Sequence, residues 1–272
     1  MKHSGWFGYT SFLMNKIMST IPTIAFYTLL EALRTRLLWL VLLMMLAVLG
    51  GSLFVQQLAI TESSRFQTAF LAAALRPASV FILSLYIVSS MAREFSERGF
   101  ELILSLDLTR TGYVLGKLAG YGALALALAC LASLLLAWFV PAQQTALWGV
   151  SLLCELWIIA AFSLFCAMTF RQIMPAASLV LGFYLLARSM TAIQLIGRSA
   201  LLDGTTLSHQ FMLTMVNGIA LALPRLDTFT QTVWLTEQNA HWALFAPIAI
   251  QTLIYCILLT AATLFDAYRK NY

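Results

Sequence analysis

The stretch GYVLGKL, residues 112–118, is the part of the sequence that comes closest to a phosphate-binding loop. Such a loop has four residues between its two glycines, then Lys and Ser or Thr, and it follows a buried strand. Here three residues separate Gly112 from Gly116, and Leu118 follows Lys117. The spacing, the missing magnesium ligand and the apolar context argue against nucleotide binding. We therefore expect no ATP hydrolysis by the chain itself.

The other residue types that perform catalysis or bind metals are scattered. All four cysteines lie inside apolar runs, which favours small buried hydrophobic residues over a disulfide framework or a zinc site. The three histidines are far apart and have no ligand spacing. The loops contain no nucleophile–base set. We expect no enzyme activity, no metal and no cofactor.

Glu155 is an acidic residue about midway along an apolar run. A charge there costs at least about 2.5 kcal/mol, so the residue must face protein, pair with a cation or stay protonated. A role in a substrate path and a purely structural ion pair both remain open. Arg76 and Arg188 border apolar runs, and we interpret both as anchors that reach the membrane surface.

The composition places these residues in a membrane. Hydrophobic residues make up 61% of the 272 residues, charged residues make up 10%, and the mean hydropathy is +0.87. A soluble domain is about one quarter charged, so this chain has more apolar surface than one core can bury. The long apolar runs predict helices rather than a barrel. The net charge of +5 indicates basic loops at a membrane rather than nucleic-acid binding.

Six apolar runs predict an all-α membrane protein of one domain, residues 1–272, with six transmembrane helices. The runs are Leu37–Val55, Pro77–Ala92 (with an extension upstream through Arg76 left open), Leu118–Val140, Ala146–Phe170, Ile173–Ala187 (which continues past Arg188) and Trp242–Phe265. With both termini cytoplasmic, eleven of the sixteen Lys and Arg residues lie inside and five outside, as the positive-inside rule requires.

Three segments outside these runs have expected positions. Residues 1–20 are expected to be flexible, and we do not expect a cleavable signal peptide in them, because the first apolar run starts too late. Residues 21–36 predict an amphipathic helix in the cytoplasmic interface, with Phe26 and Leu33 on its apolar face. Residues 198–241 form an outer segment whose apolar part is too short to span, which predicts a re-entrant or interfacial helix.

Residues 93–117 form a cytoplasmic segment with four basic and four acidic side chains: Arg93, Arg98, Arg110, Lys117, Glu94, Glu97, Glu101 and Asp107. The pairs Arg93/Glu97 and Glu94/Arg98 are four residues apart and opposite in charge, which supports a helix. A loop that only satisfies the positive-inside rule would be mostly basic and would lack the apolar run of residues 102–104. The balanced charges beside apolar residues predict a docking surface for a partner protein.

This segment resembles the connection between the second and third spans of ABC-2-type transporter permeases. The positions that match are Glu94, Gly99, Glu101, Leu102, Leu104, Arg110, Gly116 and Lys117. Phe100 stands where that family usually has Thr, and Asp107 stands where it usually has Pro. TIAFYTLLEALRTRLLWL resembles the family's interfacial helix and first span, LPRLDTFTQTVWL its Pro-x-Leu-x-x-Phe stretch, and LFDAYRKNY its C-terminal tail. The resemblance is greatest to permeases of multicopper-enzyme maturation systems.

The resemblance implies a permease in the bacterial cytoplasmic membrane that moves a substrate outward. It also implies a second permease copy as a partner, surrounded by membrane lipids. A separate cytoplasmic ATPase subunit would bind a coupling helix formed by residues 99–106, with Glu94, Gly99, Phe100, Glu101, Leu102 and Leu104 as docking residues. Arg110, Gly116 and Lys117 would form the turn and the start of the third span. The alternative is a scaffold that docks a cytoplasmic protein without transport.

Overall fold

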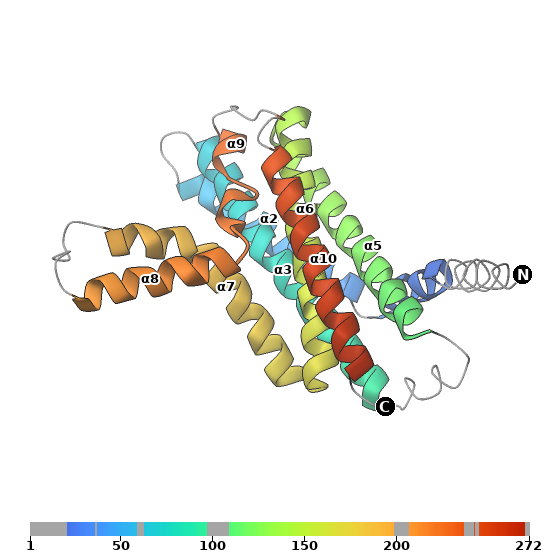
Figure 1. Ribbon diagram of the computed structural model, residues 1–272. Helices are drawn as coiled ribbons and strands as arrows, with labels where there is room; N and C mark the ends of the chain where they lie inside the picture. Colours follow the sequence, from blue (N-terminus) through green and yellow to red (C-terminus); the bar gives the residue numbers. More distant parts are fainter. Residues whose placement is uncertain are drawn as a thin grey trace, which may run out of the picture.

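The computed structural model is an all-helical bundle (Figure 1). It describes residues 21–35, 37–58, 63–96, 109–198, 207–236, 242 and 245–269. Six of its helices are long and apolar enough to cross a membrane: α2 (Leu37–Leu58), α3 (Ser63–Ser96), α5 (Arg110–Leu136), α6 (Ala142–Phe170), α7 (Ile173–Arg198) and α10 (Phe245–Arg269). The chain therefore has the character of a multi-pass membrane protein, as its apolar runs predict.

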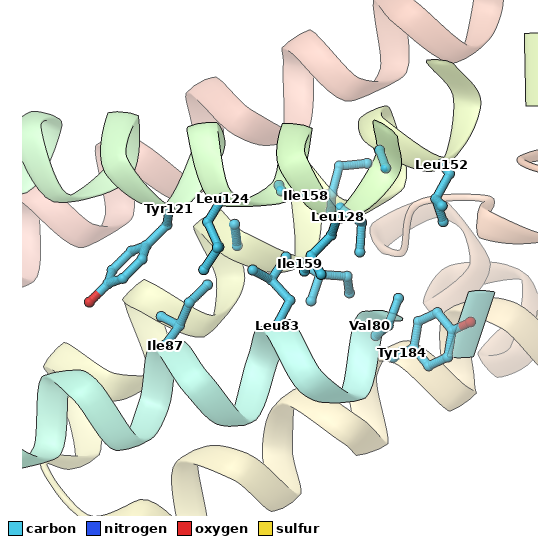
Figure 2. Packing of buried hydrophobic residues seen from close by; sticks show 14 of the residues in the cluster. Val80, Leu83, Ile87, Tyr121, Leu124, Leu128, Leu152, Ile158, Ile159 and Tyr184 are labelled. Carbon is cyan, nitrogen blue, oxygen red and sulfur yellow. The ribbon is translucent and has the colours of Figure 1, made fainter. Parts of the chain in front are cut away.

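Helix α6 lies at the centre of the bundle, in contact with α3, α5, α7 and α10. Figure 2 shows the core between α3, α5 and α6, in which Leu83 and Ile87 of α3 point toward Leu124 of α5 and Ile159 of α6. Helices α3 and α6 are largely enclosed by protein, whereas α2 and α10 are mostly exposed. Because lipid tails are as apolar as leucine, exposed apolar faces on α2 and α10 suit a bilayer.

Helix α3 begins at Ser63, before the predicted start at Pro77, so the extension upstream through Arg76 that was left open is present and is longer than expected. Pro77 lies inside the helix, and the preceding alanine-rich run stays helical because Leu71 and Leu75 are fully buried against the bundle. A proline removes one backbone hydrogen bond, and transmembrane helices tolerate this loss where neighbouring helices pack around them. Arg76 therefore lies near the middle of a 34-residue helix and not at its outer end.

Helix α5 begins at Arg110, whereas the sequence predicted a span that starts near Lys117. Thr109 caps the helix, because its side-chain oxygen accepts a hydrogen bond from the backbone N–H of Gly112 (3.2 Å). Gly116 and Lys117 consequently belong to the second turn of the helix and not to a turn between helices.

A helix over residues 21–34 packs across α5. A Cβ added at Gly116 would lie 2.8 Å from Ile24, and one at Gly120 would lie 2.7 Å from Thr28. The glycines thus permit a close approach that no other residue allows. The predicted apolar face is not the packing face, since Phe26 is 61% exposed while Thr28 is buried. The face that contacts α5 carries Ile24 and Thr28, whereas Phe26 and Leu33 are exposed.

The region before α10 contains three short elements. Helix α8 (Leu207–Ala222) lies beside α7 and projects away from the bundle (Figure 1), and Gln194 of α7 donates a hydrogen bond to Asn217 of α8 (3.4 Å). A 3-10 turn, η1 (Leu226–Thr228), and a short helix, α9 (Val233–Thr236), then return to the bundle, where η1 contacts α7 and α9 contacts α3 and α6. Residues 224–235 are called the capping segment below.

The ends of five helices meet at one end of the bundle. Arg110 donates a hydrogen bond to the carbonyl of Ala267 in α10 (2.9 Å), and Thr169 of α6 donates one to Asp266 Oδ2 (3.1 Å). Arg171, which follows α6, lies over the ring of Phe95 at the end of α3. The helix over residues 21–34 packs near this end through α5, so it lies on the same side of the bundle as the C-terminal end of α10.

Candidate functional site

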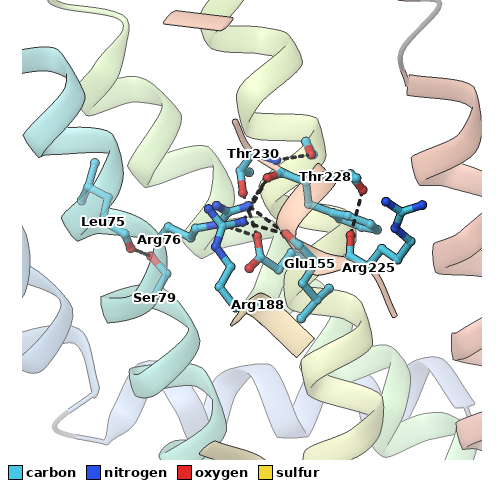
Figure 3. Close-up of polar contacts among 11 residues, drawn as sticks. Leu75, Arg76, Ser79, Glu155, Arg188, Arg225, Thr228 and Thr230 are labelled. Atoms are coloured by element: carbon cyan, nitrogen blue, oxygen red, sulfur yellow. Dashed lines mark hydrogen bonds and ion pairs between the residues drawn. The ribbon is translucent and has the colours of Figure 1, made fainter. Parts of the chain in front are cut away.

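A buried cluster of charges lies between α3, α6 and α7 and is covered by the capping segment (Figure 3). Arg76 Nε donates a hydrogen bond to Glu155 Oε2 at 2.8 Å, and the side chains are 5% and 0% exposed. Arg188 of α7 donates to the carbonyl of Leu226 at 2.7 Å. Together with Thr230, these side chains are called the arginine cluster below.

The capping segment is bound through its backbone. Arg76 donates to the carbonyls of Leu226 (3.4 Å) and Phe229, and Arg188 donates to the same two carbonyls, at 2.7 Å and 3.4 Å. The side chains of Leu226 and Phe229 are both fully buried. The two guanidinium groups therefore bind the backbone carbonyls of this turn, and the apolar side chains of the turn are buried in the bundle.

Thr230 has a left-handed backbone conformation, with φ of 41°. This conformation is unfavourable for a β-branched residue and costs on the order of 1–2 kcal/mol. Two hydrogen bonds offset it, one from the Thr230 N–H to Ser151 Oγ (2.9 Å) and one from its hydroxyl to Glu155 Oε2 (2.8 Å). Strained residues that are fixed in this way concentrate at functional sites.

The cluster keeps unused acceptor capacity. Glu155 Oε1 is buried and has no hydrogen-bond partner among the described residues, and the same holds for Asp227 Oδ1 in η1. Asp227 Oδ2 accepts a hydrogen bond from Thr191 (2.5 Å). Two carboxylates thus formally balance two guanidiniums in this part of the bundle. Each of the two oxygens has room in its hydrogen-bonding capacity for a further donor group.

The sequence predicted that Glu155 pairs or faces protein, and the structure pairs it with Arg76. The interpretation of Arg76 as a surface anchor is wrong, because its side chain is buried and charge-paired. Arg188 is not a surface anchor either, since it binds the capping segment. The continuation of an apolar run past Arg188 was predicted, but its consequence, that an arginine inside a span is buried and paired, was not drawn for Arg188 or Arg76. An arginine inside a span needs an acceptor, and Glu155 is the acid that lies inside an apolar run.

A second polar site joins the ends of α3 and α5. Lys117 Nζ lies 2.6 Å from Glu94 Oε2, and Tyr113 donates a hydrogen bond to Glu94 Oε1 at 2.8 Å. Lys117 is 8% exposed and Glu94 is 15% exposed, so this pair is protected from water. These contacts hold the end of α3 against the start of α5, the two helix ends that the connection joins.

The predicted pairs Arg93/Glu97 and Glu94/Arg98 stay predictions, and the described residues give Arg93 and Glu94 other partners. Arg93 Nη2 lies 3.8 Å from Glu31 of the first helix, at a half-exposed position, and Glu94 pairs with Lys117. Their predicted partners fall in residues 97–108, outside the described residues, together with the docking residues Gly99, Phe100, Glu101, Leu102 and Leu104. Residues 1–20 and parts of the outer segment also lie outside them.

No group of three or more metal-ligating side chains lies together among the described residues. Cys154 and Cys166 are buried among apolar side chains, as interpreted, whereas Cys130 is exposed on α5. No protein-family model matches the chain, and no curated protein is significantly similar to it.

Proposed function

We propose that the chain is the membrane-spanning subunit of an ABC-2-type transporter, driven by a separate cytoplasmic ATPase. The observation that carries the proposal is the largely buried ion pair between Glu94 and Lys117. This pair joins the end of α3 to the start of α5, the two helices that the charged connection links. A partner bound to that connection acts on two helices whose ends are tied together. A freely moving loop would transmit no force to the bundle.

Helix α3 supplies a route from the docking end to the interior. Glu94 and Arg76 are eighteen residues apart on this helix, which corresponds to about 27 Å along its axis. One end of α3 is paired with α5, and its middle binds α6 and the capping segment. A tilt of α3 caused by the ATPase would therefore strain the arginine cluster and loosen the capping segment. In this mechanism the capping segment closes the outer end of the bundle.

The orientation follows from the same proposal. The end of the bundle that carries Glu94, Arg110 and the C-terminal end of α10 faces the cytoplasm, and the membrane is the bacterial cytoplasmic membrane. Cysteines introduced at positions 61 and 204 should then react with a membrane-impermeant reagent added from outside. Reaction only after the cytoplasmic side is opened would reverse the orientation.

Docking is tested with variants of the connection between α3 and α5. Buried aromatic anchors usually carry most of an interface, so Phe100→Asp should weaken ATPase binding by about 2–4 kcal/mol. Glu101→Lys should reduce the stimulation of ATP hydrolysis while membrane insertion is retained. Arg225→Gln, at an exposed position of the capping segment, is the control.

The measurement is co-purification of the ATPase, together with substrate-stimulated ATP hydrolysis of the complex. If Phe100→Asp and Glu101→Lys both retain full binding and stimulation, the connection is only a solvated loop and the proposal fails. If the partner binds but the complex shows no ATP-driven transport, the scaffold alternative is the better description. The purified chain alone should hydrolyse no ATP.

A further inference from the structure

A cavity of about 780 Å³ opens where the first helix passes into α2, beside α3 and the start of α7. We propose that it binds one anionic phospholipid, with the phosphate between Arg34 and Arg93 and an acyl chain along α2 and α3. This inference concerns a site separate from the arginine cluster, and it does not depend on the proposed transport function.

The charged end of the cavity has an excess of positive charge. Arg34 is exposed and forms no ion pair or hydrogen bond with another described residue. Arg93 lies 3.8 Å from Glu31, and both side chains are about half exposed. The Glu31 carboxylate also accepts a hydrogen bond from Ser90 (3.1 Å), so Arg93 shares it. The two arginines and one glutamate leave a net charge of +1, and guanidinium groups are well suited to phosphate.

The rest of the cavity is apolar and follows the helix axes. Its wall includes Leu37 and Leu40 of α2 and Phe81, Ile82 and Leu85 of α3. Leu40 and Phe81 are about half exposed, so the wall opens sideways from the bundle. An acyl chain that enters from the bilayer meets this wall directly and covers it.

Tyr86 also lines the cavity and is 6% exposed. Its hydroxyl is buried, so the residue offers no donor to a ligand. Arginines at the mouth and an apolar wall match the phosphate and the acyl chain of a phospholipid.

Free phosphate and zwitterionic lipid are the alternatives that an experiment must separate. A free phosphate ion would use the arginines and leave the apolar wall uncovered. A zwitterionic lipid would gain less from the net positive charge. The proposal therefore predicts both headgroup selectivity and a requirement for the acyl chain.

The test is lipid binding by the full chain in mild detergent, measured by native mass spectrometry. Phosphatidylglycerol and phosphatidylethanolamine with identical acyl chains are titrated, and inorganic phosphate and glycerol 1-phosphate serve as competitors. Arg34→Gln with Arg93→Gln should raise the dissociation constant of phosphatidylglycerol on the order of tenfold or more. Arg225→Gln removes the same charge at an exposed position outside the cavity and should leave the constant unchanged.

Two further variants keep the test decisive. If the double variant does not fold, Arg34→Gln alone is informative, because this exposed side chain makes no contact that the fold needs. Leu40→Trp fills the apolar part and should weaken phosphatidylglycerol binding without loss of stability.

The proposal is overturned if the arginine variants bind phosphatidylglycerol like the unmodified chain, or if both lipids bind equally. Displacement of the lipid by inorganic phosphate at equal concentration would instead identify a free-phosphate site.

Discussion

Replacement of Glu155 by Gln removes the negative charge of the buried pair while the shape of the side chain is nearly retained. Glu155 is fully buried, and its Oε2 accepts two hydrogen bonds of 2.8 Å, from Arg76 and from Thr230. Loss of one partner from a buried ion pair costs about 3–5 kcal/mol, because the other charge stays buried and uncompensated. Gln can still accept a hydrogen bond, so we expect about 3 kcal/mol, the lower end of this range.

The companion variants are Arg76→Gln and the double variant. Arg76→Gln also removes donors to the carbonyls of Leu226 and Phe229, so it should cost about 4–5 kcal/mol. In the double variant neither charge remains, and the loss should be smaller than the sum of the single losses by about 2 kcal/mol. Glu31→Gln is the matched control, since its half-exposed pair with Arg93 should contribute at most about 1 kcal/mol.

The assay is reversible unfolding in mixed detergent micelles, followed by hydrogen exchange of the peptide that contains the capping segment. The N–H of Thr230 is protected by Ser151, and this protection should fall in Glu155→Gln before the whole bundle unfolds. Losses that simply add in the double variant would show that the two charges are not coupled. Equal effects of Glu155→Gln and Glu31→Gln would refute the argument as a whole.

The remaining predictions concern the packing and the ion pair at α5. Gly120→Ala should destabilise the protein by about 1–3 kcal/mol, because its Cβ would lie 2.7 Å from a side chain of the first helix. Gly122→Ala is the matched control with an ordinary contact of 3.6 Å, and it should be neutral or stabilising in a melting-temperature measurement. Glu94→Lys and Lys117→Glu should each lower the melting temperature, and the combined exchange should recover part of the loss. Absence of any recovery would show that the mutual attraction of the pair contributes nothing.

The membrane character and the number of spans follow from the sequence because four of the six apolar runs are about one bilayer long. The other two runs, 77–92 and 173–187, are shorter, and their helices continue into flanking residues. The partners of the buried charged side chains cannot be predicted from the sequence, because they depend on which helices pack against each other. Glu155 and Arg76 are far apart in the sequence and become neighbours only when α6 packs on α3. Lys117 looked like a flanking residue of a span because its run of apolar neighbours starts after it. Its burial depends on Glu94, which α3 brings to the side of α5.

The first helix shows a similar limit. Its sequence has one apolar and one polar face, but it packs through a third face that includes Thr28 and Ala32. Small residues carry little hydrophobic signal, so periodicity cannot identify them as a contact surface. The glycines of α5 were the available clue, because small residues on one helix let another helix approach closely.

The two buried arginines bind the capping segment by peptide carbonyls, and every amino acid provides the same carbonyl. The exposed side chain of Arg225 can therefore vary without loss of the acceptors. The distance along the chain between Leu226 and Phe229 cannot vary, because both carbonyls must reach the same pair of guanidinium groups. Substitution of the exposed Arg225 should be tolerated, whereas insertion or deletion of one residue between Leu226 and Phe229 should not. The two arginines recognise the path of the backbone in this turn, while the buried side chains of Leu226 and Phe229 add packing.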